Sequence, residues 1–109
     1  MGYYVDLAVN GQQTLEKFSN NIYSLIILDA GLPDIQGIEV GKRIRILEKK
    51  NKANRIPIIL LSAYPSISLK KWCKEAEIDN FSTKPIPYKD LYIMLENIFK
   101  QKAVNNEIF

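Results

Sequence analysis

Short runs of aliphatic residues alternate along the chain with longer segments in which apolar residues recur every three or four positions. Two of the runs hold no polar side chain, Leu25–Leu28 and Ile56–Leu61. Apolar runs of this length are typical of strands that are buried on both faces of a parallel sheet. The sequence therefore predicts two buried strands, each followed at its carboxyl end by a polar residue, Asp29 after the first and Ser62 after the second.

Two further segments have the character of strands. Tyr3–Val9 is rich in aromatic and β-branched residues and stops at Asn10 and Gly11, which predicts a strand followed by a turn. Near the carboxyl terminus, Asn80–Thr83 predicts a short strand that leads directly into Lys84. We therefore expect four strands in all.

The segments between and after these strands have the apolar spacing of amphipathic helices. The predicted helices cover Gln12 to Phe18, about four turns marked by Ile38 to Leu47, a segment that carries Leu69 to Ala76, and Tyr88 to Lys102. We expect the polar face of the second helix to carry the charged residues Lys42, Arg43, Arg45 and Glu48. Residues 103–109 are expected to form a loose or partner-ordered tail.

Strands that alternate with helices favour right-handed crossovers and a parallel sheet, so we predict one α/β domain over residues 1–109. In such a sheet the carboxyl ends of the strands lie at one edge, where open α/β sheets bind ligands. Asp29, Ser62 and Lys84 are thus expected to converge on one pocket. A carboxylate nucleophile, a hydroxyl donor and an ammonium ion together suit a phosphoryl group.

The composition narrows the chemistry further. The chain has no histidine, so it has no imidazole to act as general base, metal ligand or phosphoryl carrier. The net charge is only +3, and the basic run from Lys42 to Arg55 is typical of a solvated helix face, so we expect no nucleic-acid partner. No segment has the length of a membrane span and the first residues lack signal-peptide character, which predicts a cytoplasmic location without membrane contact by this segment.

Three motifs together resemble those of a response-regulator receiver domain, the phosphoacceptor module of two-component signalling. They are similar to the phosphoacceptor strand and loop, the hydroxyl strand and the lysine motif of that family. In this chain they are Leu28-Asp29 with Leu32-Pro33-Asp34 and Gly37, then Leu61-Ser62-Ala63, then Thr83-Lys84-Pro85. The resemblance runs from about Tyr4 to Phe99 and implies a flavodoxin-like (CheY-like) parallel sheet with flanking helices.

The resemblance implies that Asp29 takes a phosphoryl group from a phosphohistidine and becomes an aspartyl phosphate. Lys84 would pair with the phosphoryl oxygens, and Ser62 would hydrogen-bond one of them. Mg²⁺ would draw charge from the group in transfer, with Asp29 and the carbonyl of Gly31 among its ligands. The implied partner is a histidine kinase or a histidine phosphotransfer protein of a phosphorelay, and the loop is similar to that of receivers in hybrid sensor histidine kinases.

The resemblance also implies roles for groups around the phosphoryl site. Backbone amides at Ala30 and Ala63 would donate to the phosphoryl oxygens, and the peptide bond from Lys84 to the following proline would be cis. Movement of Ser62 toward the phosphoryl group would open space into which Phe81 rotates. These two residues would then bias a surface with two states.

The first strand-helix unit of the family has no counterpart here, because the chain starts at the second strand. That unit supplies an acidic pair that holds Mg²⁺, so we expect an incomplete metal site and impaired phosphorylation, with a deletion or a boundary within a longer protein as the explanation. In the strand order 2-1-3-4-5 the absent strand lies between Tyr3–Val9 and Leu25–Asp29. These segments must pair directly, find a strand in another copy, or leave apolar edges exposed, and we favour a strand-exchanged or tightly packed homodimer.

Two other functions fit part of the pattern. A phosphate-independent pseudo-receiver keeps the fold as a protein-interaction module and has lost the metal chemistry. A phosphohydrolase of the haloacid-dehalogenase type also places a nucleophilic Asp after an apolar strand, but it needs a second Asp two positions later, where this chain has Gly31. We therefore expect a non-enzymatic phosphoacceptor module, with the pseudo-receiver as the alternative.

Overall fold

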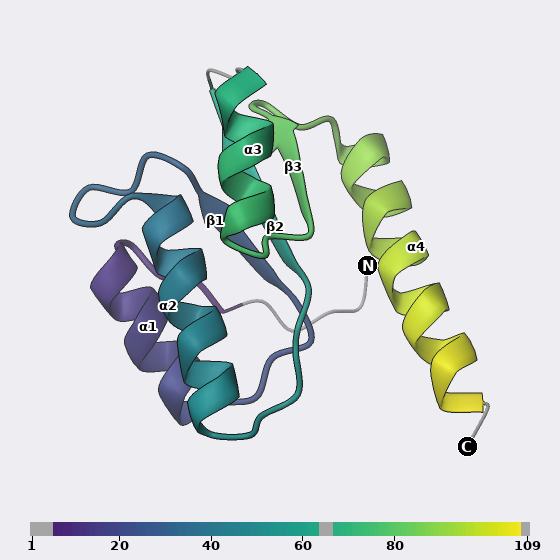
Figure 1. Cartoon of the computed structure of the whole chain (residues 1–109). Helices are drawn as coiled ribbons and strands as arrows, with labels where there is room; N and C mark the ends of the chain where they lie inside the picture. The colour runs from purple at the N-terminus through teal and green to yellow at the C-terminus, as the bar shows by residue number, and fades with distance from the viewer. Residues whose placement is uncertain (1–5, 64–66, 108–109) are drawn as a thin grey trace.

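The computed structural model describes residues 6–63 and 67–107, and over these residues it contains one parallel sheet with flanking helices (Figure 1). The strands are β1 (Ile26–Asp29), β2 (Ile58–Ser62) and β3 (Asn80–Thr83), and they lie in the sheet order β1-β2-β3. The helices are α1 (Gly11–Asn20), α2 (Gly37–Lys50), α3 (Ile67–Glu75) and α4 (Tyr88–Glu107). The predicted α/β alternation and the parallel sheet are confirmed for three of the four expected strands.

β2 is the central strand. Ile58, Ile59 and Leu60 have no exposed surface, because β2 is paired on both edges and covered on both faces. The strand starts after Pro57, which has no N–H for the ladder, although its carbonyl accepts the amide of Ile26 at 3.0 Å. Both neighbouring strands run parallel to β2 in register, so the carboxyl ends of all three lie at the same edge.

α2 begins directly beneath the end of β1. Val40 and Ile44 place its inner face in the core. A Cβ atom on Gly37 would lie 2.3 Å from the carbonyl oxygen of Asp29, and the Gly37 amide donates to the carbonyl of Ala30 at 3.1 Å. Only a residue without a side chain allows this approach, so the start of α2 fixes the position of the strand end above it.

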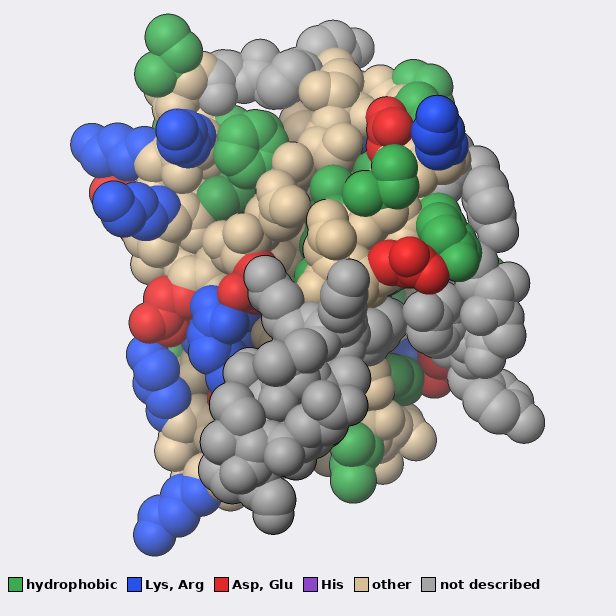
Figure 2. All heavy atoms as spheres, turned by 90° about the vertical axis from the view of Figure 1, so that its right-hand side faces the viewer, with side chains coloured by type: hydrophobic (Ala, Val, Ile, Leu, Met, Phe, Trp, Pro, Cys, Tyr) green, Lys and Arg blue, Asp and Glu red, His purple; other side chains and the backbone are tan. Residues whose placement is uncertain are grey.

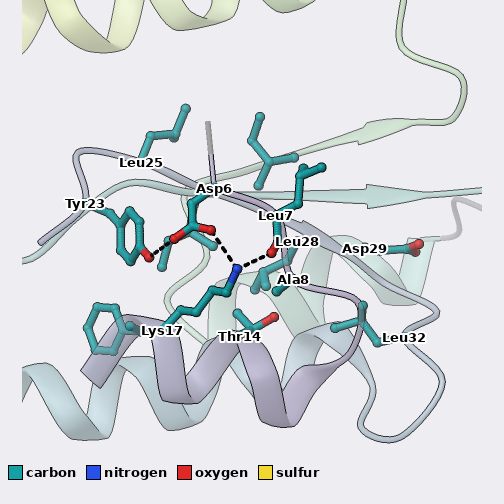
Figure 3. Close-up of a pocket in the computed structure, with 13 residues that line it drawn as sticks. Asp6, Leu7, Ala8, Thr14, Lys17, Tyr23, Leu25, Leu28, Asp29 and Leu32 are labelled. Atoms are coloured by element: carbon teal, nitrogen blue, oxygen red, sulfur yellow. Dashed lines mark hydrogen bonds and ion pairs between the residues drawn. The ribbon is translucent and has the colours of Figure 1, made fainter. Parts of the chain in front are cut away.

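The segment before α1 departs from the prediction. The strand predicted over Tyr3–Val9 is wrong for residues 6–9, which are not in a strand, and its other residues lie outside the described part of the chain. Asp6 forms an ion pair with Lys17 at 2.6 Å and accepts a hydrogen bond from the Tyr23 hydroxyl at 2.7 Å (Figure 3). The segment is therefore held by side chains to α1 and the loop after it, rather than to β1 by backbone pairing.

The edge of β1 that faces away from β2 carries no strand among the described residues. The amides of Ile26 and Ala30 bond to carbonyls on the β2 side, so by alternation the backbone groups of Ile27 and Asp29 point to the other edge. A cavity of about 210 Å³ lies along this edge, between β1, α1 and residues 6–8 (Figure 3). Among the described residues, no strand pairs with this edge of β1, and Ile27 is 42% exposed.

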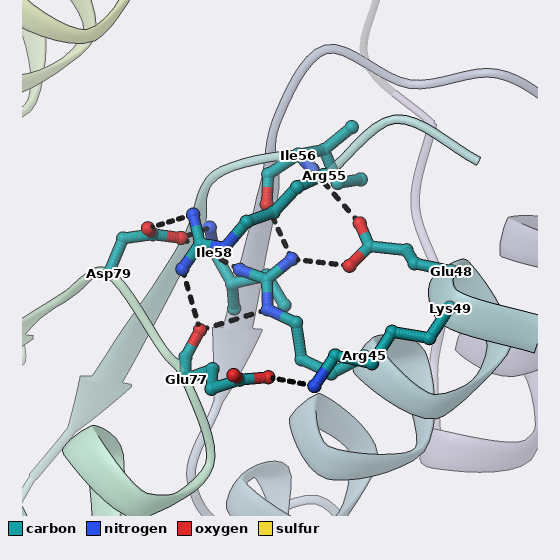
Figure 4. A network of polar contacts seen from close by, with 8 residues as sticks. All are labelled: Arg45, Glu48, Lys49, Arg55, Ile56, Ile58, Glu77 and Asp79. Atoms are coloured by element: carbon teal, nitrogen blue, oxygen red, sulfur yellow. Dashed lines mark hydrogen bonds and ion pairs between the residues drawn. The ribbon is translucent and has the colours of Figure 1, made fainter. Parts of the chain in front are cut away.

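Charged side chains form a network at the amino ends of the strands, at the end of the sheet opposite to the carboxyl ends (Figure 4). The prediction that Arg45 and Glu48 lie on the polar face of α2 is wrong, since they are 3% and 4% exposed. Arg45 donates to Glu48 at 2.7 Å, to Asp79 at 2.8 Å and to the carbonyls of Ile56 and Glu77. Their burial is possible because these contacts satisfy the charges, and the network ties α2 to the segments that lead into β2 and β3.

The last helix is longer than predicted. α4 continues to Glu107 instead of ending at Lys102, so residues 103–107 are helical where a loose or partner-ordered tail is expected. The physical reason is local, because these five residues include neither glycine nor proline to stop the helix. The remaining two residues of the predicted tail, 108–109, lie outside the described part of the chain.

The surface seen from the α4 side is mixed in character (Figure 2). Lys and Arg side chains gather along one side of this view, whereas hydrophobic side chains are scattered among polar groups and backbone. Large hydrophobic residues that are exposed on the last two helices are Ile67, Trp72, Tyr92 and Ile93. Within residues 6–63 and 67–107, none of the helices is both long and apolar enough to cross a membrane.

Candidate functional site

Polar groups at the ends of the three strands meet around one cavity. Asp29 is the last residue of β1, Ser62 is the last residue of β2, and Lys84 directly follows β3. All three line a cavity of about 470 Å³ at the carboxyl edge of the sheet, and so do Ala30, Gly31 and Ala63. The convergence predicted from the order of the strands is therefore present in the structure.

The shortest polar contact in this cavity joins Lys84 to Asp29. The Lys84 Nζ lies 2.5 Å from Oδ1 of Asp29, and the amide of Gly31 donates to the same oxygen at 2.9 Å. The Lys84 ammonium first, and then the Gly31 amide, hold the pKa of Asp29 below its ordinary value. The side chains of Lys84 and Asp29 are 35% and 42% exposed, so the carboxylate is ionised at neutral pH and open to a reactant.

The backbone places Ser62 beside Lys84. The carbonyl of Ser62 accepts the amide of Lys84 at 2.8 Å, which adds one bond to the ladder beyond the last paired residue of β3. Ser62 itself is 8% exposed and belongs to the lining of the cavity. The peptide bond from Lys84 to Pro85 is cis, as the resemblance implies.

The loop after β1 is anchored to α1 by Asp34. Its carboxylate accepts the amides of Gly11 at 2.7 Å and Gln12 at 2.9 Å, at the amino end of α1, and the amide of Ile35 at 2.8 Å. The Gln12 amide first, and then the Gly11 amide, hold the pKa of Asp34 below its ordinary value. This carboxylate thus fixes the loop that carries Gly31.

Two details of the site go beyond the predicted residues. The Ala30 amide donates to the carbonyl of Leu61 at 2.8 Å as the last bond of the β1-β2 ladder, and the Gly31 amide reaches the Asp29 carboxylate. Strand alternation accounts for the first of these bonds, because the first amide after β1 points toward β2. Gln36 also lines the cavity and has no counterpart among the predicted site residues.

The predicted switch residue lies apart from the cavity. Phe81 is in β3, opposite Leu60, and is half-buried against the core. It does not belong to the described lining of the cavity that contains Ser62. The structure therefore places Phe81 one strand away from the hydroxyl with which it is predicted to move.

Comparison with known families shows which family this chain belongs to. The profile of the response regulator receiver domain matches residues 1–96. The chain belongs to the response regulator receiver domain family. The resemblance carried by the three strand-end motifs is confirmed, and the chain is a receiver domain of two-component signalling.

Curated relatives include both hybrid kinases and transcriptional regulators. The receiver domain is 31% identical over 102 residues to hybrid signal transduction histidine kinase B of Dictyostelium discoideum, an alignment that covers 86% of this chain and 5% of the kinase. It is 32% identical over 102 residues to the transcriptional regulatory protein CusR of Escherichia coli (strain K12), with 94% of this chain and 43% of the regulator covered. The chain thus spans only part of these relatives, from 4% to 44% of the length of those first matched.

Solved structures confirm the CheY-like fold. A receiver domain protein (CheY-like) from Methanospirillum hungatei JF-1 has a TM-score of 0.80 at 25% identity, with 94% of this chain and 78% of that chain covered. The chemotaxis protein CheY4 of Vibrio cholerae also has a TM-score of 0.80, at 26% identity, with 89% and 78% covered. The sheet and helices described here are therefore those of a receiver domain.

Receiver domains bind Mg²⁺ at the phosphorylation site, and this chain offers part of such a site. Asp29 is the one carboxylate in the described lining of the cavity, with Gly31 beside it. Nowhere in the described residues do three or more His, Cys, Asp or Glu side chains group in a way that could hold a metal. Mg²⁺ is usually bound through one or two carboxylates together with water and phosphate oxygens. The described lining supplies one carboxylate, and its Oδ1 already contacts Lys84 and the Gly31 amide, so the described residues supply only part of the expected Mg²⁺ site.

Proposed function

We propose that this receiver domain accepts a phosphoryl group on Asp29 from a phosphohistidine. The observation that carries the proposal is the 2.5 Å contact between Lys84 Nζ and Asp29 Oδ1 inside an open cavity that Ser62 also lines. A cation held beside an ionised, accessible carboxylate is the arrangement that guides a dianionic group to a nucleophile. The Asp, the Lys and the Ser come from three different strand ends, so the fold itself brings them together.

In the proposed transfer, a carboxylate oxygen of Asp29 forms a bond to phosphorus and the P–N bond of the donor breaks. The electron pair of that bond returns to the ring nitrogen of the donor. Lys84 pairs with the phosphoryl oxygens, Ser62 and the Ala63 amide donate hydrogen bonds to them, and the Gly31 amide continues to hold the Asp29 carboxylate. We assign the Ala30 amide to fixing the end of β1, because it is already bonded to β2.

The transfer is expected to be slow with this chain alone. Asp29 and the Gly31 carbonyl supply two oxygen ligands for Mg²⁺, and the described cavity adds no second carboxylate. A metal held by so few protein ligands binds weakly. We therefore infer that Asp29 phosphorylation requires a high concentration of Mg²⁺ or of the donor.

Direct labelling tests the proposal. The purified chain is incubated with acetyl phosphate or phosphoramidate over a range of Mg²⁺ concentrations, and a hydroxylamine-sensitive phosphoryl adduct is followed by intact-mass spectrometry. We expect the adduct on the wild type and on Glu39→Gln, an exposed acid of α2 outside the cavity, and none on Asp29→Asn. Adduct formation on Asp29→Asn, or on no variant under any condition, contradicts the proposal.

For the partner, we propose a histidine kinase or a histidine phosphotransfer protein of a phosphorelay. The hybrid histidine kinases among the relatives support this assignment. Because such kinases draw the phosphoryl group from ATP, we place residues 1–109, as one receiver domain, in the cytoplasm or on the cytoplasmic side of a membrane-bound sensor. The test is phosphoryl transfer to Asp29 from a phosphorylated phosphotransfer protein, which should be faster than from acetyl phosphate.

We also propose that Ser62 and Phe81 form the switch. Phe81 is half-buried rather than fully packed, and it pairs with Leu60, two residues before Ser62 on β2. A change at the hydroxyl is therefore one strand away from the aromatic ring. If the proposal holds, phosphorylation changes the ¹⁹F signal of fluorophenylalanine at position 81 in the wild type but not in Ser62→Ala, with phosphorylation of both checked by mass.

A phosphate-independent interaction module is the second candidate. The single carboxylate in the described cavity favours it, because a domain that does not hold a metal loses the main aid to phosphoryl transfer. This function predicts that Asp29→Asn binds a histidine phosphotransfer protein with the same affinity as the wild type, with or without a phosphodonor. A change in affinity on labelling of Asp29 contradicts it and favours the phosphoacceptor.

A homodimer is the third element of the proposal. The open edge of β1, the adjoining cavity and the exposed Ile27 are apolar surface and backbone that association would cover. We expect light scattering after size exclusion to give a dimer at micromolar concentration, and Ile27→Lys to shift it toward the monomer. A stable wild-type monomer overturns this part and leaves the phosphoacceptor role intact.

A further inference from the structure

The cavity at the carboxyl edge is larger than a phosphoryl group requires, and one wall of it is apolar. Besides the polar groups already described, it is lined by Ile38 of α2 and by Leu69 and Trp72 of α3. Its volume of about 470 Å³ lies in the range of small-molecule sites. The chemistry assigned to Asp29 and Lys84 makes no use of this apolar wall.

Trp72 is the feature of the wall that packing alone does not explain. It is the one tryptophan of the chain, and it is 49% exposed. Its helix is nevertheless fixed, because Leu69 and Cys73 on the same helix are 5% and 3% exposed and belong to the core. Trp72 is thus a half-exposed residue of the cavity lining on a helix that is packed into the core, and an indole ring can stack with planar groups.

We propose that the apolar wall formed by Ile38, Leu69 and Trp72 receives the nitrogen heterocycle of the phosphodonor, and that Trp72 determines the preference for donors that carry such a ring. This inference rests on the proposed phosphoacceptor function. The wall is continuous with the phosphoryl site, since Asp29, Lys84 and Trp72 line the same cavity. In this proposal, a donor whose phosphoryl group lies at Asp29 has its ring against this wall of the same cavity.

The chemistry of a phosphorylated imidazole matches the wall. The protonated ring is a planar cation, which is attracted to the face of an indole. The attached phosphoryl group is a dianion, so the donor has a net negative charge that suits Lys84. On transfer, the carboxylate of Asp29 bonds to phosphorus, the electron pair of the P–N bond returns to the ring nitrogen, and the ring leaves as neutral imidazole without needing a proton from the protein.

Two donors with the same P–N bond separate the ring from the rest of the chemistry. N-Phosphoimidazole carries the ring, and phosphoramidate does not. Initial rates of Asp29 phosphorylation are measured with both donors over a range of concentrations in identical buffer. The variants are Trp72→Ala, Trp72→Phe, which keeps an aromatic ring, and Ile67→Ala, which removes a 95% exposed residue of the same helix that does not line the cavity.

We expect Trp72→Ala to lower the ratio of the phosphoimidazole rate to the phosphoramidate rate by about three- to tenfold. The loss should appear in the KM for phosphoimidazole rather than in the maximum rate. Trp72→Phe should retain most of the ratio, and Ile67→Ala all of it. An unchanged phosphoramidate rate in Trp72→Ala shows that the variant is folded.

Two results overturn the inference, and they are distinguishable. If Asp29 is labelled by both donors and the ratio is the same in Trp72→Ala as in the wild type, the ring does not use the wall, while the phosphoacceptor function stands. If neither donor labels Asp29 in the wild type, the proposed function fails and this inference fails with it.

Discussion

The two ends of the sheet use the same kind of ion pair in different surroundings. At the amino ends of the strands, Arg45 and Glu48 are in contact at 2.7 Å and their side chains are each 4% exposed. At the carboxyl ends, Lys84 and Asp29 are in contact at 2.5 Å, and their side chains are 35% and 42% exposed. The two contact distances are similar, so the two ion pairs differ in their exposure to solvent and in the other groups that each cation contacts.

Those remaining partners explain why one end is structural and the other reactive. Arg45 also binds Asp79 and two backbone carbonyls, so every nitrogen of its guanidinium has a partner that the fold supplies (Figure 4). Lys84 has three donor hydrogens, and among the described residues Asp29 is its ion-pair partner. The buried Arg45 pair therefore holds segments of the chain together, whereas the half-exposed Lys84 can still donate hydrogen bonds to an incoming anion.

The largest effect on stability is expected when the buried Arg45–Glu48 pair is broken. Arg45→Met removes the cation and leaves Glu48 buried without it, so the free energy of unfolding should fall by about 3–5 kcal/mol. Urea denaturation followed by circular dichroism measures this. Arg43→Met is the matched control, because its pair with Glu39 on the same helix is 48% exposed on both sides and should contribute less than about 0.5 kcal/mol. Equal effects of the two variants contradict the comparison.

The reactive pair should show the reverse pattern. Lys84→Met removes a half-exposed cation, so the free energy of unfolding should change by less than about 1 kcal/mol. The rate of Asp29 phosphorylation by phosphoramidate should instead fall by about 100-fold, because a cation aimed at the phosphoryl oxygens acts mainly in the transition state. Stability comes from the same urea titrations and the rate from mass spectrometry. A variant that unfolds readily but reacts normally would assign Lys84 to structure.

A third variant tests how the reactive end is held in place. A Cβ on Gly37 would lie 2.3 Å from the carbonyl oxygen of Asp29, so Gly37→Ala must push α2 away from β1. We expect a loss of about 1–3 kcal/mol in unfolding free energy, together with slower labelling of Asp29. Gly31→Ala is the control in the same loop, because its Cβ would meet only Asp29 Oδ1 at 3.8 Å. Similar thermal unfolding of the two variants would contradict the close contact.

Much of the site at the carboxyl ends of the strands can be predicted, because the strands that carry it have local sequence patterns. Asn80–Thr83 forms the strand predicted for it, and the apolar runs before Asp29 and Ser62 form the other two. Once three parallel strands are in place, the residues at their carboxyl ends have to meet at one edge. The pocket that joins Asp29, Ser62 and Lys84 therefore follows from strand order alone.

The structural end was not predictable because its partners are distant in the sequence. Arg45 and Glu48 are polar, and a helix pattern places polar residues toward solvent. Both nevertheless continue the stripe of α2 that carries Val40 and Ile44. Asp79 completes the network and is 34 positions from Arg45 in the sequence. A local sequence pattern does not predict a contact over that separation. The strand prediction for residues 6–9 is wrong for a related reason, since their strand character is local but a strand also needs a neighbour to pair with.

The smallest effect on stability is expected at Asp34, which belongs to neither ion pair but connects the loop after β1 to α1. Its carboxylate accepts the amides of Gly11 and Gln12, and these hold its pKa below the ordinary value of 3.8. A carboxyl whose pKa is lowered by folding contributes stability that is fully present above its unfolded pKa and is lost as the pH falls through its folded pKa. The contribution of Asp34 should therefore be present at neutral pH and disappear in acid.

Asp34→Asn should accordingly destabilise the domain at neutral pH and have progressively less effect below about pH 4. The neutral amide replaces one of the two acceptor oxygens with a donor, so it cannot accept from Gly11 and Gln12 as the carboxylate does. Urea midpoints of the wild type and the variant, measured from neutral to acidic pH, give the difference at each pH. A difference that stays constant over this range would mean that Asp34 stabilises the loop through its shape and not through its charge. The carboxyl end of β1 would then be held by uncharged contacts such as that of Gly37 with the Asp29 backbone.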